Sequence, residues 1–302
     1  MLASLAQAVA LVGYGNGYLN GLLAEPPDLV GSNSAFQFVG ALQFAKLRSK
    51  SLLDRVLRPR SEEEVIASTT ADWFRYLRSN GVRQLSLALV GHSSDSPAHI
   101  AISYAGSSQW VIVASGTETA MWRSSERVIG APEFPKGAVT NASLQEFLKE
   151  HNAALSARPD KRIWRVSFLG VVNAQPAGMG VTVPVANANL RDALDAGIAF
   201  TGKADLPFWR EWLQGAREQL DSSSPRARFN DDALPTLGYS TASHALYAGA
   251  ASAWVFGGMG SWNDMSFGGE LQREYKEATS RLYAAVAGAV VAAANAFAVG
   301  ER

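Results

Sequence analysis

Hydrophobic residues recur at helical spacing through the C-terminal part of the chain. From Leu271 to Ala296, apolar positions fall three or four residues apart, as one face of a helix requires. Charged residues fill the other positions as far as Arg281, and none occurs within residues 282–300. The pattern predicts a long helix whose first half lies on the surface and whose second half is largely buried.

A different pattern, in which large apolar residues alternate with small or polar ones, predicts β-strands in the middle of the chain. The predicted strands cover residues 84–90, 100–104, 110–114, 120–128 and 163–172. Short connections between the first four leave no room for crossover helices, so these strands should pair antiparallel. The sequence therefore predicts an α+β fold, in which an antiparallel β-meander of about five strands is covered by helices from both chain ends.

We expect one domain spanning residues 1–302, with a division into two lobes near residue 135 as the alternative. The chain of 302 residues is 47% hydrophobic, enough for one large core or two modest ones. Segments rich in proline, glycine or serine occur, but none shows the abrupt change of composition that marks a flexible interdomain linker.

Charge and composition exclude several classes of protein. Basic and acidic residues number 27 each, which removes the usual electrostatic reason to expect nucleic acid or an anionic membrane as partner. Without cysteine there is no disulfide, thiolate nucleophile or cysteine-ligated metal. Residues 282–300 are mostly alanine, which gains little from lipid, and no basic residue precedes Glu25, as a secretory signal would require. We expect a soluble, cytoplasmic protein.

One segment carries a possible catalytic motif. Residues 87–96, LALVGHSSDS, place a serine shortly after a predicted strand, which follows a helix predicted at 71–78. These residues resemble the nucleophile elbow of the α/β-hydrolase family, in which an exposed serine attacks an ester or amide carbonyl. The family's motif has glycine where Asp95 stands here.

The resemblance implies a serine hydrolase with Ser93 as nucleophile and His244 as base. Asp232 or Asp231 would orient the imidazole, which preserves the family's order of serine, acid and histidine along the chain. The competing interpretation is a strand that ends in a polar turn, where serine and aspartate side chains bond the local backbone.

Cofactor motifs are not intact. Residues 13–21, GYGNGYLNG, lack the glycine spacing of a dinucleotide fingerprint, because the position five after Gly13 is Tyr18. We interpret this segment as a flexible or tightly packed turn. The four histidines show no pairwise spacing of three to five residues, as metal ligands on one element would. We expect no cofactor and no metal.

Trp122 heads the first group of candidate binding residues. Its predicted strand also carries Arg123 and Glu126. A solvent-facing tryptophan beside an arginine and a glutamate is a candidate hot spot for interaction with a partner.

Trp262, Asn263 and Asp264 form the second group, in the glycine-rich segment 255–270. The glycines there favour a corner between two helices, with the tryptophan pinning the junction by burial. Should the corner border a pocket, Asn263 and Asp264 are its candidate polar groups.

With no intact catalytic motif, the sequence favours a non-catalytic binding or inhibitory protein, such as one resembling an immunity factor that neutralises a toxin. Its partner would be another protein or a small molecule. The serine hydrolase built on Ser93 and His244 is the alternative, and a small-molecule enzyme with a pocket beside Trp262 is a third.

Overall fold

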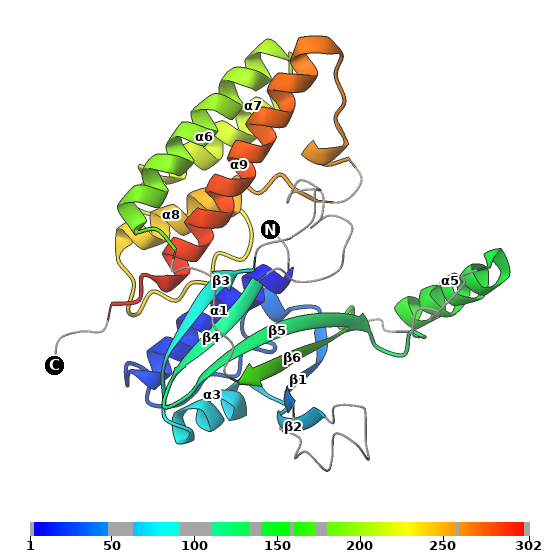
Figure 1. Ribbon diagram of the computed structural model, residues 1–302, viewed down its shortest axis with the longest axis vertical. Helices are drawn as coiled ribbons and strands as arrows, with labels where there is room; N and C mark the ends of the chain where they lie inside the picture. Colours follow the sequence, from blue (N-terminus) through cyan, green and yellow to red (C-terminus); the bar gives the residue numbers. More distant parts are fainter. Residues whose placement is uncertain are drawn as a thin grey trace.

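A computed structural model describes residues 3–47, 63–90, 110–132, 140–157, 160–172, 180–257 and 260–298 (Figure 1). Within these residues, seven α-helices accompany one six-stranded sheet. The strands are β1 (Val39–Leu47), β2 (Glu63–Ala67), β3 (Val82–Leu89), β4 (Trp110–Gly116), β5 (Thr119–Val128) and β6 (Trp164–Val172). The helices are α1 (Ala3–Leu19), α3 (Thr70–Ser79), α5 (Asn141–Ser156), α6 (Val183–Lys203), α7 (Pro207–Gln219), α8 (Thr241–Ser252) and α9 (Gly269–Asn295), with short 3₁₀ turns η1 (Ser34–Phe36) and η2 (Trp262–Asp264).

The sheet is mixed, and the prediction of a purely antiparallel, five-stranded meander is wrong. Strand order is β2-β1-β6-β5-β4-β3. The predicted antiparallel pairing holds for β4 with β5 and for β5 with β6. β3 pairs antiparallel directly with β4, where the prediction placed a strand at 100–104 between them. β1 adds to β6 in parallel, and β2 closes the far edge. A parallel pair needs a long connection, and here it contains α3 and the whole meander. The predicted strand at 100–104 lies outside the described residues.

The long C-terminal helix is confirmed as α9, which is exposed in its first turns and mostly buried from Leu282 onward. It lies with α6, α7 and α8 in a bundle beside the sheet (Figure 1). Helices from both chain ends pack against the sheet, α1 on β3 and β4 and α9 on β3. A single cluster of buried apolar side chains runs from the sheet, including Phe168, into the bundle, including Val290. No described helix is both long and apolar enough to cross a membrane.

The glycine-rich segment at 13–21 is mostly helical, so the prediction of a turn there is wrong. Its glycines lie inside or just after α1, where close packing outweighs their low helix propensity. A Cβ at Gly15 would stand 2.5 Å from Leu85 Cδ1 and 2.8 Å from Phe74 Cε1. The absence of a side chain at this position therefore lets α1 lie directly against the sheet.

Two asparagines cover the open edge of β3. Asn16 of α1 accepts a hydrogen bond from the Leu85 N–H at 2.7 Å and donates to the Leu85 carbonyl at 2.8 Å. Asn295 of α9 accepts from the Leu87 N–H at 2.7 Å and donates to the Leu87 carbonyl at 2.9 Å. Each carboxamide takes the place of a peptide group of a neighbouring strand. At Leu85 and Leu87, the backbone groups that an edge strand otherwise leaves open are thus satisfied.

Candidate binding pocket beneath helix α3

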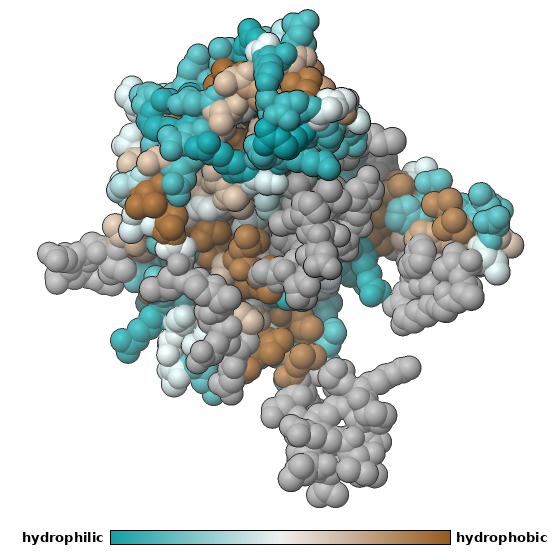
Figure 2. Space-filling view, turned by 45° about the horizontal axis from the view of Figure 1, so that its top comes forward, coloured by the Kyte–Doolittle hydropathy of each residue, from teal (hydrophilic) through white to brown (hydrophobic). Residues whose placement is uncertain are grey.

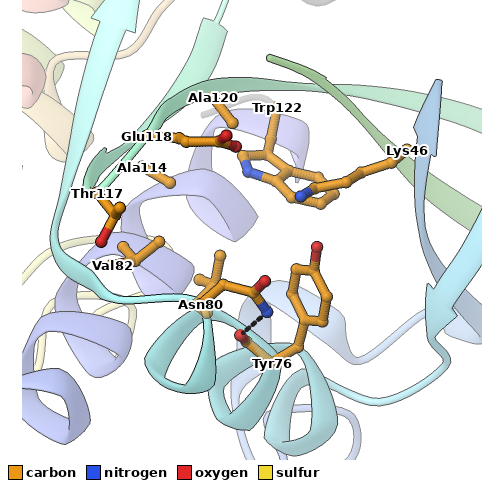
Figure 3. Close-up of a pocket in the computed structure, with 10 residues that line it drawn as sticks. Lys46, Tyr76, Asn80, Val82, Ala114, Thr117, Glu118, Ala120 and Trp122 are labelled. Atoms are coloured by element: carbon orange, nitrogen blue, oxygen red, sulfur yellow. Dashed lines mark hydrogen bonds between the residues drawn. The ribbon is translucent and has the colours of Figure 1, made fainter. Parts of the chain in front are cut away.

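A cavity of about 260 Å³ lies between α3 and the sheet (Figure 3). We call it the α3 pocket. Its wall combines one face of α3, the turn between β4 and β5, and side chains from the sheet. The residues that line it are Lys46, Tyr76, Leu77, Asn80, Val82, Ala114, Thr117, Glu118, Ala120 and Trp122.

The register of three neighbouring strands brings together the sheet residues that line the pocket. Lys46 of β1 is aligned with Gly170 of β6, which is aligned with Trp122 of β5. These three positions form one row, and the missing side chain in its middle is the reason the indole can lie flat. A Cβ at Gly170 would stand 2.9 Å from the six-membered ring of Trp122. In the next row Ala120 faces Ala114, and both small side chains leave space beneath α3.

The opposite wall is held by capping and burial of α3. Thr69 caps the helix, its hydroxyl accepting from the Asp72 N–H at 3.0 Å. Trp73 is buried under the helix and meets Trp122 edge-on, with ring centroids 5.4 Å apart. These contacts hold α3 in an orientation that turns its Tyr76 side toward the pocket.

Trp122 is 1% exposed, yet its indole Nε1 donates to no acceptor among the described residues. A buried donor left without a partner costs about 1–3 kcal/mol. In Figure 3 the nitrogen-bearing edge of the indole is turned toward the side where Ala120 and Glu118 line the pocket. The pocket therefore contains a hydrogen-bond donor that an oxygen atom of a bound molecule could satisfy.

Charged groups of opposite sign lie at the two ends of the pocket. Figure 3 shows the Lys46 and Glu118 side chains extending toward Trp122 from opposite sides. Lys46 is partly buried, and its Nζ lies 4.9 Å from the centre of the Tyr76 ring, within the range of a cation–π contact. Asn80 donates to the Tyr76 carbonyl at 2.7 Å and steadies the end of α3.

The prediction that Trp122 faces solvent is wrong. Its polar neighbours in the strand suggested exposure, but consecutive residues of a strand point to opposite faces. Arg123 lies on the other face and is exposed. Glu126 shares the face of Trp122, is partly buried, and burial raises the pKa of its carboxyl. An exposed hot spot made of the three residues is therefore not formed.

The predicted base and acid of a hydrolase do come together. His244 of α8, Asp231 and Asp232 line one open groove of about 750 Å³, which we call the His244 groove. Tyr14 of α1 and Ser34 of η1 line it as well. Ser93, the predicted nucleophile, lies outside the described residues.

Of the two aspartates in this groove, Asp231 is the one whose charge acts on the pKa of the His244 imidazole. Burial lowers the pKa of His244, and the charge of Asp231 and a hydrogen bond with the Pro235 backbone act in the opposite direction. Asp232 instead accepts the Ser34 N–H at 2.8 Å. The imidazole is thereby kept neutral near pH 7, as a general base requires.

The predicted corner between two helices is present between α8 and α9. Trp262 is fully buried, and its Nε1 donates to Thr279 Oγ1 at 2.8 Å. Tyr275 donates from its hydroxyl to the Trp262 carbonyl at 2.6 Å, and the carboxylate of Asp264 accepts the Gly260 N–H. Asn263 lies beside them in η2 and is partly buried. These contacts give Trp262 and Asp264 structural roles in the corner.

Among the described residues, no group of three or more histidine, aspartate or glutamate side chains is placed to hold a metal ion. No protein-family model matches the chain, and comparisons with curated proteins and with solved structures find no match either.

Proposed function

We propose that this is a non-catalytic binding protein that takes a small molecule into the α3 pocket. The observation that carries the proposal is the Trp122 indole, which lines the cavity and whose buried N–H has no acceptor among the described residues. Buried donors of folded proteins are nearly always satisfied. An acceptor atom of a ligand would complete this one.

Pocket size limits the ligand. A water molecule occupies about 30 Å³ of the liquid, so a cavity of about 260 Å³ has the scale of a small molecule of roughly ten non-hydrogen atoms. The lining residues include no histidine and a single carboxylate, Glu118. They offer aromatic faces, an N–H donor and an ammonium group, which are contacts for binding rather than an acid–base pair.

The experiment follows the Trp122 indole directly. Protein labelled with ¹⁵N-tryptophan gives indole N–H resonances, and Trp122→Phe identifies the one that belongs to the pocket. The probes are L-leucine, 4-methylpentanoate and 3-methylbutylamine, which share one carbon skeleton. We expect at least one probe to shift the Trp122 indole proton downfield in a saturable way, because a new N–H···O bond forms.

A matched control separates binding from general perturbation. Trp209 of α7 is remote from the α3 pocket and packs against Trp262, so its indole resonance, identified with Trp209→Phe, should stay in place. If none of the three probes moves the Trp122 resonance at concentrations up to about 10 mM, where even Kd values in the millimolar range give partial saturation, the proposed function is overturned.

The serine hydrolase is kept as the second candidate because His244 and Asp231 share an open groove. A neutral imidazole beside a carboxylate is what nucleophile activation by a serine protease-like triad would use. This candidate needs Ser93 at the same groove, and it is tested by active-site labelling, as set out below.

A further inference from the structure

We infer that the ligand of the α3 pocket is a short hydroxy acid, whose hydroxyl group lies between Trp122 Nε1 and the Glu118 carboxylate and whose own carboxylate pairs with Lys46. The inference rests on the proposed function and adds the chemical class of the ligand. It is based on a donor and an acceptor that share one side of the cavity and a cation that lies on the other side.

The indole nitrogen of Trp122 and the side chain of Glu118 lie on the same side of the pocket (Figure 3). No hydrogen bond joins them in the described part of the chain, and the buried indole N–H is left without an acceptor. Glu118 belongs to the turn between β4 and β5 and is exposed, so its carboxylate has the freedom to adjust to a bound group. The two side chains therefore offer such a group one donor and one acceptor.

A hydroxyl group satisfies both side chains, because its oxygen accepts from an N–H while its own O–H donates to a carboxylate. Other common groups satisfy only one of the two. A ligand carboxylate at the indole N–H would stand beside the Glu118 carboxylate and be repelled. An ammonium group would pair with Glu118 but has no lone pair for the indole N–H. A carbonyl oxygen would accept from the indole and leave Glu118 without a donor.

Lys46 places a positive charge at the opposite side of the pocket. It lies two strands from Trp122 in the row that runs through Gly170, and its side chain extends toward the indole from the side away from Glu118. Its Nζ contacts the face of the Tyr76 ring at 4.9 Å, and no ion pair joins it to a carboxylate of a described residue. An anionic group bound at Lys46 is thus kept away from Glu118.

The wall between these two ends is apolar. Leu77, Ala114 and Ala120 line it and are buried. A short aliphatic chain between the hydroxyl and the carboxylate of the ligand suits this surface. A compound such as 4-hydroxypentanoate has about eight non-hydrogen atoms, which agrees with the size derived from the cavity volume.

Three compounds of the same shape test the group that lies at Trp122 Nε1. 4-Methylpentanoate, one of the probes of the proposed function, has a methyl group where 4-hydroxypentanoate has its hydroxyl, and 4-aminopentanoate has an ammonium group there. We expect 4-hydroxypentanoate to bind at least about tenfold more tightly than either analogue, with Kd measured from the Trp122 indole shift or by calorimetry.

Two variants assign the polar groups of the ligand to their partners. Glu118→Ala should reduce the preference for 4-hydroxypentanoate over 4-methylpentanoate to about threefold or less, because the hydroxyl loses its acceptor. Lys46→Gln should weaken binding of 4-hydroxypentanoate at least about tenfold and leave the affinity for 1,4-pentanediol, which has no carboxylate, unchanged. Glu150→Ala and Lys149→Gln, on the exposed helix α5, are the matched controls and should change none of these values. Both pocket side chains are partly or fully exposed, so neither replacement should unfold the protein.

Equal affinity for 4-hydroxypentanoate and 4-methylpentanoate would overturn the inference and leave the pocket as a binding site, with a water molecule rather than a ligand hydroxyl between Trp122 and Glu118. Tighter binding of 4-aminopentanoate would also overturn it, because an ammonium group would then be the partner of Glu118. Affinities that Glu118→Ala and Lys46→Gln leave unchanged would contradict the assigned partners. Failure of every probe to move the Trp122 resonance would instead overturn the proposed function itself.

Discussion

Asn295 offers a sharp test of how the sheet edge is stabilised. Its carboxamide makes two hydrogen bonds to the backbone of Leu87, one to the N–H and one to the carbonyl. Asn295→Ala removes both at once and leaves the two peptide groups facing α9 without partners. Alanine has a higher helix propensity than asparagine, so the change is otherwise favourable by some tenths of a kcal/mol.

The magnitude follows from the number of groups orphaned. A buried backbone group that loses its partner costs about 1–3 kcal/mol. Two such groups, less the gain in helix propensity, give an expected loss of about 2–5 kcal/mol in the free energy of unfolding. Since domains are stable by about 5–15 kcal/mol, this single side chain accounts for a substantial part of the total. Replacing Asn16, which is 1% exposed, with alanine should lower the free energy of unfolding by at least as much.

Urea unfolding followed by far-UV circular dichroism at 25 °C measures the effect, with Asn152→Ala on the exposed face of α5 as the control. The control should stay within about 0.5 kcal/mol of the wild type, as surface substitutions usually do. An Asn295→Ala protein that unfolds within the same margin, with an unchanged dependence on urea, would refute the assignment of Asn295 as an edge clamp.

Three further predictions concern the pockets. Gly170→Val should displace the Trp122 indole, because even a Cβ at this position would stand 2.9 Å from its ring. The free energy of unfolding should fall by about 1–3 kcal/mol, and the Trp122 indole resonance should shift. An unmoved resonance would contradict the alignment of Gly170 with Trp122. His244 has a lowered pKa in the folded state, so its contribution to the free energy of unfolding is present above about pH 6.5 and is lost as the pH falls through the lowered value. His244→Gln should flatten this part of the pH dependence of the urea midpoint. An unchanged pH profile would contradict a lowered pKa at His244. A fluorophosphonate probe should not label the protein; labelling that Ser93→Ala abolishes would instead establish the hydrolase.

Elements with a strong local signal could be predicted from the sequence. The apolar stripe of α9 and its loss of charge after Arg281 specify both the helix and its change from surface to interior. Strands β4 and β5 alternate and are joined by a tight turn, so their antiparallel pairing follows from local pattern alone.

The remaining features depend on contacts between distant segments. β1 pairs with β6 more than a hundred residues away, and no local pattern specifies a parallel partner. The α3 pocket depends on this pairing, because Lys46 joins Trp122 only through the register across Gly170. A glycine inside an alternating strand indicates close approach of another group, and Gly170 was the one signal that could have pointed to the pocket. The contact of Asn16 with β3 could not be predicted either, because the glycine-rich sequence around Asn16 favours a turn when considered alone.

The position of β1 in the sheet has a consequence for the order of events during synthesis. The β3–β4–β5 meander can form as soon as residue 128 leaves the ribosome, but the β1–β2 pair cannot join the rest of the sheet until β6 is made. During that interval one edge of β1 has no partner strand. Unpaired strand edges are recognised by chaperones and by aggregating chains. We therefore expect the pairing of β1 with the much later β6 to be the slow step of folding. Mutations in β6 should reduce the yield of folded chains more than mutations at equally buried positions of β4.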